Sequence, residues 1–168
     1  MTRSLTVKKE IRTFGLDLCN PLRVVGAVTR GGDYLDGVLL LSSNPTLDTT
    51  WIASKILRTR FFPELRLIMT HDPERKLDPM EIERLTKLSV ITVESTRKRQ
   101  SNGFKSYKVR RKQLQVKSSL TPGILQEILS TTWTTGTLPE PLRIAHLLER
   151  SRFSGKTHVS KPTNKFAS

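Results

Sequence analysis

The stretch IRTFGLDL at Ile11–Leu18 opens the part of the chain that decides the fold. Its residues alternate as in a β-strand, and Asp17 falls near the end of that strand. Two more strand-like stretches follow, LRVVGAVT at Leu22–Thr29 and YLDGVLLL at Tyr34–Leu41. Asn-Pro and Gly-Gly-Asp motifs mark the turns between them. The sequence therefore predicts an antiparallel meander of three strands.

Beyond residue 48 the pattern changes to helices that alternate with short apolar strands. Asp48 or Thr49 suits the cap of the first helix, Asp78 suits the cap of the second, and Pro79 suits a first helical position. Because the helices at about 48–60 and 78–88 each connect two strands, the strands at 65–70 and 90–93 are expected to run parallel through right-handed crossovers. The expected helices cover about 48–60, 78–88, 121–133 and 139–152, and the expected later strands cover 65–70, 90–93 and 114–117.

This order of elements resembles an α/β protein of the ribonuclease H-like class, which includes endonuclease V. That fold has a three-stranded antiparallel meander followed by parallel strands with crossover helices. Its first strand and its next central strand lie side by side and aim carboxylates at one spot. The resemblance implies that Asp17 and the end of the strand at 65–70 come together.

The charge of the chain is strongly positive and unevenly placed. The 168 residues carry 29 Lys and Arg against 15 Asp and Glu, a net charge of +14. Two stretches without acids account for the excess: Arg97, Lys98, Arg99, Lys105, Lys108, Arg110, Arg111, Lys112 and Lys117, and then Arg150, Arg152, Lys156, Lys161 and Lys165. Cations that bind phosphates release counterions, so the expected partner is DNA, structured RNA or a ribonucleoprotein. The sequence leaves the oligomeric state open.

We expect one domain at residues 1–154, with a basic insertion at 95–117 and a basic flexible tail at 155–168. The insertion is polar and aperiodic, which is typical of a flexible loop or an extended ribbon. Phe104 and Tyr107 lie among its lysines, where aromatic rings can stack on unpaired bases.

Several classes of protein are excluded by composition. No apolar run approaches the ~20 residues of a membrane span, and neither basic stretch has an apolar face for a membrane surface. Cys19 is the only cysteine, which excludes a disulfide framework and a cysteine zinc cluster. These features predict a cytoplasmic protein without a membrane partner.

Two blocks of sequence carry a more specific resemblance. The first is KKEIRTFGLD at Lys8–Asp17, continued by RVVGAVTRGGDYLDGV at Arg23–Val38, and the second is GTLPEPLRIAHLLERS at Gly136–Ser151. Together they resemble the endonuclease dU family, long catalogued as domain of unknown function ninety-nine. That family is similar to endonuclease V and is seen mostly in archaea.

The resemblance implies an endonuclease that acts on DNA with deaminated bases and uses divalent metal bound by carboxylates. The implied cofactor is Mg²⁺ or Mn²⁺, because these ions prefer oxygen ligands. Asp17 matches the first-strand aspartate of the family and is the leading metal ligand and catalytic residue. Leu18 stands where the family usually has a second acid. Asp36 also matches a family position, as a catalytic residue or as a hairpin residue satisfied locally.

The middle of the chain departs from the family. After LIM the family has Asp-Gly, whereas this chain has Thr70, His71, Asp72 and Pro73. If the strand ends before these residues, Asp72 can turn toward Asp17 and complete a metal pair. If the strand continues, His71 takes that place, because alternate positions face opposite sides.

Residues on two helices complete the candidate site. Glu81 matches another family acid, although it can equally be a solvent-facing helix residue. On the last helix, Arg143, His146 and Arg150 share one side at spacings of three and four. Arg143 and His146 can bind a phosphate or orient a water, or they can be structural residues that hold the helix to the sheet.

Two functions follow from these residues. The missing acidic pair and the shifted aspartate favour a nucleic-acid-binding member of the family with weakened or lost nuclease activity. The retained Asp17 and the intact Pro-Glu-Pro-Leu-Arg block favour an active Mg²⁺-dependent endonuclease that cleaves DNA containing uracil or hypoxanthine.

Overall fold

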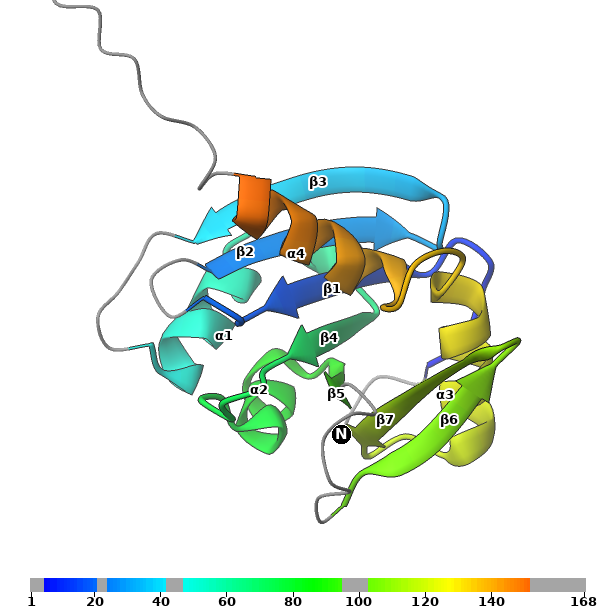
Figure 1. Cartoon of the computed structure of the whole chain (residues 1–168). Helices are drawn as coiled ribbons and strands as arrows, with labels where there is room; N and C mark the ends of the chain where they lie inside the picture. The colour runs from blue at the N-terminus through cyan, green and yellow to red at the C-terminus, as the bar shows by residue number, and fades with distance from the viewer. Residues whose placement is uncertain (1–4, 21–23, 42–46, 95–102, 152–168) are drawn as a thin grey trace, which may run out of the picture.

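A computed structural model of the chain describes residues 5–20, 24–41, 47–94 and 103–151 (Figure 1). The predicted tail at 155–168 and the cations Arg97, Lys98 and Arg99 lie outside these residues. The elements are, in order, β1 (Arg12–Asp17), β2 (Val24–Arg30), β3 (Tyr34–Leu41), α1 (Thr49–Leu57), the 3-10 turn η1 (Phe62–Glu64), β4 (Leu67–His71), α2 (Pro79–Thr86), β5 (Ser89–Glu94), β6 (Lys105–Val109), β7 (Lys112–Ser118), α3 (Pro122–Thr132) and α4 (Glu140–Ser151).

The described strands form one mixed sheet in the order β3-β2-β1-β4-β5-β7-β6 (Figure 1). The first three strands are an antiparallel meander, which confirms the prediction from the opening stretch. β4 pairs parallel with β1, and β5 pairs parallel with β4, as expected for strands joined by crossover helices. β1 and β4 thus lie side by side near the centre of the sheet.

Two apolar clusters cover the opposite faces of this sheet. Leu67 and Met69 of β4 pack with α3 and the start of α4, whereas Ile68 between them packs with α1 and α2. Successive strand residues point to opposite faces, so α3 and α4 form one helical layer and α1 and α2 form the other. Below, we call these the α4 face and the α2 face.

The helix starts follow the local chemistry that the sequence predicts. The Asp48 carboxylate accepts a hydrogen bond from the Trp51 N–H, and Asp78 accepts from the N–H groups of Met80 and Glu81. Pro79 occupies the first position of α2. These bonds satisfy donors that a helix start otherwise leaves unpaired.

α4 packs unusually close to β1 at Gly15. A Cβ at this position would lie 2.3 Å from the Pro141 carbonyl carbon and 2.4 Å from its oxygen, so no larger residue fits. Because the two backbones approach this closely, the next turns of α4 lie over the end of β1 (Figure 1). His146 belongs to those turns.

Within the basic insertion, residues 105–118 form the antiparallel hairpin β6–β7, which continues the sheet beyond β5. The described part is therefore an extended ribbon, not a flexible loop. Tyr107 and Phe104 are each only 8% exposed, and Tyr107 belongs to the core beside α3. Packing in the core thus keeps Tyr107 from stacking on bases, whereas Phe104 lies at the pocket described below.

Candidate functional site

β1 and β4 end together, and this is where the candidate site lies. Asp17 is the last residue of β1, His71 is the last residue of β4, and the two are register partners. Register partners on neighbouring strands point to the same face, here the α4 face. Since β4 extends through His71, the histidine and not Asp72 takes the place beside Asp17.

The Asp17 carboxylate is fully buried, and both of its oxygens have protein partners. Oδ1 accepts a hydrogen bond from the Cys19 N–H at 2.9 Å and lies 3.6 Å from Nδ1 of His71. Oδ2 lies 2.6 Å from Nδ1 of His146 on α4. Burial raises the pKa of Asp17, but the neighbouring His71 and Cys19 outweigh it and lower the pKa below its usual value. The carboxylate is therefore ionised and held in one orientation.

Cys19 completes the group, which we call the Asp17 cluster: Asp17, Cys19, His71 and His146. Its Sγ lies 3.3 Å from Nδ1 of His71. Burial, followed by the nearby Asp17, raises the pKa of Cys19 to about 12, so its thiol keeps its proton at neutral pH. Donor atoms of Asp17, Cys19 and His71 all lie within 4.8 Å of one another. Cys19 was not predicted as a site residue, although its spacing of two from Asp17 was a signal.

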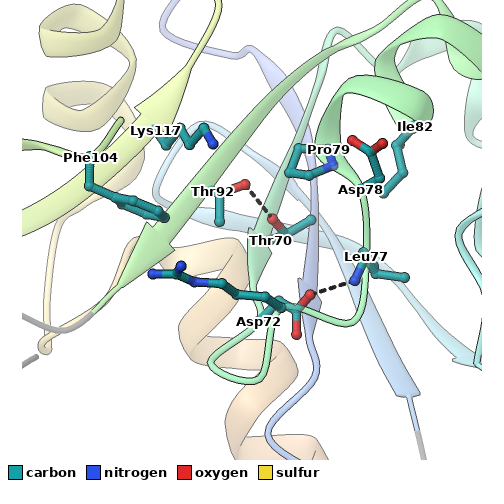
Figure 2. Close-up of a pocket in the computed structure, with 10 residues that line it drawn as sticks. Thr70, Asp72, Leu77, Asp78, Pro79, Ile82, Thr92, Phe104 and Lys117 are labelled. Carbon is teal, nitrogen blue, oxygen red and sulfur yellow. Dashed lines mark hydrogen bonds between the residues drawn. The ribbon is translucent and has the colours of Figure 1, made fainter. Parts of the chain in front are cut away.

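Asp72 lies in different surroundings, next to a pocket on the α2 face (Figure 2). Its Oδ2 accepts a hydrogen bond from the Leu77 N–H at 2.8 Å, and its Oδ1 has no hydrogen-bond partner among the described residues. The pocket has a volume of about 310 Å³ and is also lined by Thr70, Thr92 and Phe104. Within the described ranges, no donor cluster joins Asp72 to Asp17.

The groups around Asp17 do not fit Mg²⁺. This ion demands near-octahedral coordination by oxygen ligands, and Mn²⁺ also prefers oxygen. Asp17 supplies the one carboxylate of the cluster, whereas its contacts are two imidazoles and Cys19. The buried acids Glu149 and Asp72 act on Cys19 through their charge, but neither belongs to the group of donor atoms around Asp17. The family-implied ion therefore lacks an oxygen-rich set of protein ligands at this position.

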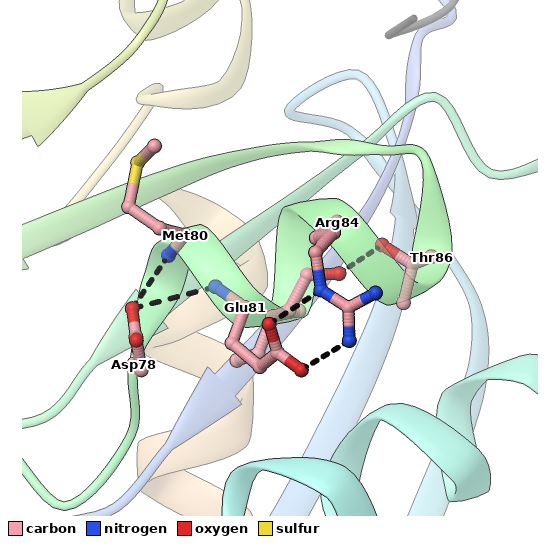
Figure 3. A network of polar contacts seen from close by, with 6 residues as sticks. Asp78, Met80, Glu81, Arg84 and Thr86 are labelled. Atoms are coloured by element: carbon pink, nitrogen blue, oxygen red, sulfur yellow. Dashed lines mark hydrogen bonds and ion pairs between the residues drawn. The ribbon is translucent and has the colours of Figure 1, made fainter.

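The predicted residues Asp36 and Glu81 are not brought to Asp17. Asp36 lies near the opposite end of β1, where its carboxylate pairs with Arg12 at 2.8 Å and Arg30 at 3.1 Å. The hydrogen bond from Arg12 is the main reason that the pKa of Asp36 is lowered. Glu81 pairs with Arg84 one turn further along α2, at 2.7 Å (Figure 3). Both carboxylates are satisfied locally.

The start of α4 holds a second polar group around Glu140. This buried carboxylate accepts hydrogen bonds from Thr135 Oγ1 at 2.7 Å and from Arg143 Nε and Nη2 at 2.9 and 2.7 Å. Burial raises the pKa of Glu140, but Arg143 and Thr135 outweigh it, so the pKa is lowered. Of the residues predicted to share one side of α4, His146 thus reaches Asp17, whereas Arg143 is bound to Glu140.

The predicted nucleic-acid-binding residues that the structure describes lie mainly on the hairpin. Lys105, Lys108, Arg110, Arg111 and Lys117 are exposed there. Lys112 instead lies over the ring of Trp133, with its Nζ 5.4 Å from the ring centroid. Arg150 is exposed in the last turn of α4.

Solved structures define the class of protein. A protein of unknown function from Archaeoglobus fulgidus is similar with a TM-score of 0.67 and 22% identity, over 86% of this chain and 99% of that one. Marinitoga piezophila Argonaute, in complex with 5′ OH guide RNA and target DNA, is similar with a TM-score of 0.58 and 13% identity. That match covers 88% of this chain but only 30% of the Argonaute chain. The fold is therefore a mixed α/β sheet of the ribonuclease H-like class.

Sequence relatives then identify the family. The chain is 31% identical to the UPF0215 protein of Methanosarcina mazei, over 88% of this chain and 93% of that protein. It is 30% identical to the UPF0215 protein of Methanopyrus kandleri, over 90% of this chain and 95% of that protein. The chain belongs to the UPF0215 family. No protein-family model matches it.

None of the helices in the described part of the chain is long and apolar enough to cross a membrane.

Proposed function

We propose that this protein binds nucleic acid, DNA or structured RNA, and that it is a diverged member of the endonuclease dU family with weakened or lost nuclease activity. The β6–β7 hairpin carries the proposal, because its cations are exposed while its apolar residues anchor it to the core. Because the ribbon is already ordered, its cations can bind a phosphate backbone without the entropy cost of ordering the chain. The likeness to Argonaute, solved with guide RNA and target DNA, supports a nucleic-acid partner.

The direction of the hairpin side chains supports an open binding face. Tyr107, Val109, Leu114 and Val116 point into the core beside α3. Lys108 and Lys117 alternate with these residues and are exposed, so they point away from α3. Lys117 also lines the pocket beside Asp72 (Figure 2). Phosphates lying along this side of the sheet would meet the lysines directly.

The arrangement at Asp17 supports the loss of nuclease chemistry. A carboxylate that holds Mg²⁺ in a nuclease needs an oxygen facing the ion and oxygen-bearing neighbours. Here the buried carboxylate contacts Cys19, His71 and His146, and His71 takes the position of the expected second acid.

One observation favours the second candidate function, an active Mg²⁺- or Mn²⁺-dependent endonuclease on DNA with uracil or hypoxanthine. The pKa of Asp17 is lowered, so the carboxylate is ionised, and it orients His146, whose side chain is 30% exposed. A histidine oriented by a carboxylate is a recurring general base. The Asp17–His146 pair at the end of β1 is thus the feature that an active endonuclease would use.

Binding is tested by fluorescence anisotropy with labelled single- and double-stranded DNA and RNA over a series of salt concentrations. The variant replaces Lys108, Arg111 and Lys117 with Ala. For each phosphate that the variant no longer neutralises, the slope of log affinity against log salt should flatten by about 0.9 on duplex DNA. The matched control replaces three exposed cations outside the hairpin, Lys8, Lys9 and Arg58, with Ala.

We expect the hairpin variant to bind more weakly and with a flatter slope, and the control to resemble the original protein. Equal slopes for both variants would reject the hairpin as the binding surface. Cleavage of DNA containing uracil or hypoxanthine, in Mg²⁺ or Mn²⁺, is measured in parallel. Cleavage that Asp17→Ala abolishes would show that the endonuclease is active and contradict the proposed loss.

A further inference from the structure

We propose that Asp17, Cys19 and His71 bind one transition-metal ion of the Zn²⁺ type, in preference to Mg²⁺. Each residue offers one donor atom, an oxygen, a sulfur and a nitrogen, and these atoms lie within 4.8 Å of one another. Thiolate and imidazole are ligands that Zn²⁺ accepts and that Mg²⁺ avoids. The inference does not depend on the proposed nucleic-acid binding.

Two of the three spacings between donor atoms fit a tetrahedral ion, and the third is within 4.8 Å. Zinc bonds of about 2.0–2.3 Å at tetrahedral angles place two ligand atoms about 3.3–3.7 Å apart. Here Cys19 Sγ and His71 Nδ1 lie 3.3 Å apart, and His71 Nδ1 and Asp17 Oδ1 lie 3.6 Å apart. Small rotations of the side chains would direct all three atoms at one centre.

The fourth member of the Asp17 cluster supports the ligands from outside. His146 Nδ1 contacts Oδ2 of Asp17 at 2.6 Å, which leaves Oδ1 on the side of Cys19 and His71. Outer groups that hold a ligand in place in this way are a regular part of metal sites. His146 is therefore a positioning residue for the Asp17 ligand.

Charge balance also favours a divalent ion at this buried position. Asp17 is fully buried, and a buried charge is costly unless it is compensated. When the ion binds, the Cys19 thiol releases its proton to solvent and becomes a thiolate. The carboxylate and the thiolate then offset the two positive charges, and the nearby acids Glu149 and Asp72, whose charges act on Cys19, also favour a cation here.

The site is accessible to an ion from solvent. The His71 side chain is 15% exposed and that of His146 is 30% exposed, so the cluster lies below the surface without being sealed. Three protein ligands leave a fourth position for water or another small ligand, as in zinc sites that are not purely structural.

The test uses the untagged full chain, stripped of metal by a chelator and titrated with Co²⁺, a spectroscopic probe for zinc sites. We expect one Co²⁺ per chain, with a thiolate-to-cobalt charge-transfer band and the intense visible bands of four-coordinate cobalt. Zn²⁺ should displace Co²⁺, whereas millimolar Mg²⁺ should not. The absence of a charge-transfer band in the unaltered chain would overturn the proposal without any variant.

The variants assign the ligands. Cys19→Ser should remove the charge-transfer band, His71→Ala and Asp17→Asn should abolish binding, and His146→Ala should weaken binding by about 10–100-fold. Asp72→Asn is the matched control, because it changes a neighbouring buried carboxylate outside the Asp17 cluster.

A charge-transfer band that persists in Cys19→Ser would overturn the proposal. Loss of Co²⁺ binding in Asp72→Asn, together with full Co²⁺ binding in His71→Ala, would also overturn it. Circular dichroism checks the folding of each variant, and His71→Gln replaces His71→Ala if the alanine variant does not fold.

Discussion

The two faces of the sheet differ sharply where β4 ends. On the α4 face, His71 joins Cys19 and His146 in a set of polar groups that each contact Asp17. On the α2 face, the next residue, Asp72, has one hydrogen bond to the chain and one oxygen without a partner among the described residues, beside a pocket of about 310 Å³. One step along the chain thus separates two side chains with opposite surroundings.

This difference shows how α4 changes the chemistry of a strand end. α4 brings His146 against Asp17, which can happen only because Gly15 lets the helix approach the strand. The Asp72 carboxylate instead accepts its hydrogen bond from the backbone of its own loop, just before α2 begins. The α4 face is therefore rich in donor groups held by one another, and the α2 face remains open to solvent or a ligand.

The largest expected effect comes from separating α4 from the sheet. In Gly15→Val the new side chain would collide with backbone atoms of Pro141, which cannot move unless α4 moves. We expect a loss of about 3 kcal/mol in the free energy of unfolding, measured by urea denaturation. Because the collision lies on the α4 face, the hydrogen bond between Asp72 and Leu77 should survive in the folded fraction.

Gly123→Ala is the matched control, since a Cβ at this position in α3 meets nothing within 4 Å. It should change stability by no more than about 1 kcal/mol and in the stabilising direction. Similar destabilisation by both substitutions would contradict the close approach of α4 and β1.

A smaller effect should distinguish the two carboxylates directly. In metal-free buffer, Asp17→Asn removes a charge that His146 and Cys19 hold in the buried cluster, and we expect a loss of about 2 kcal/mol in the free energy of unfolding. Asp72→Asn keeps an oxygen for the Leu77 N–H and removes a buried charge, so the change should stay within about 1 kcal/mol. Equal losses in urea denaturation would show that the two faces hold their carboxylates alike.

The smallest effect concerns the start of α4. The pKa of Glu140 is lowered from 4.5 in the folded protein, so the unfolded chain takes up this proton first as the pH falls. The stability that Glu140 contributes is therefore fully present above about pH 4.5 and is lost as the pH falls through its folded pKa. We expect Glu140→Gln to be less stable than the original protein at neutral pH and the difference to shrink in acid.

Urea midpoints across this range of pH measure that difference. Glu127→Gln, on the exposed side of α3, controls for the removal of one acid. A stability difference for Glu140→Gln that does not change with pH would show that the pairing with Arg143 and Thr135 does not hold the charge.

Much of the fold could be predicted because local signals agreed with it. The meander follows from alternating residues, and α2 starts at Pro79 with Asp78 as its cap, as the sequence indicates. The basic hairpin was harder to predict. Its turn lies at Arg110, which has a φ of 57° although it is neither Gly nor Asn, so the usual turn signal is missing. Its apolar alternation at Tyr107, Val109, Leu114 and Val116 was obscured by the charges between them.

The candidate site could be predicted only in part. Asp17, His71 and His146 were all considered from the sequence, and the structure places them together. Asp36 and Glu81 were considered for the same site, but both lie in local ion pairs. A residue's own surroundings in the chain do not show which distant groups its side chain will meet.

The sequence by itself determined strands β1 to β5, the helix starts and the segregation of charge, because periodicity, capping and composition act over short distances. Only the tertiary structure decided the chemistry at the end of β4. It extended the strand through His71, which turned Asp72 to the other face, and it packed His146 against Asp17 across 129 residues of sequence. That contact depends on how closely a helix and a strand pack, and packing is a property of the whole fold.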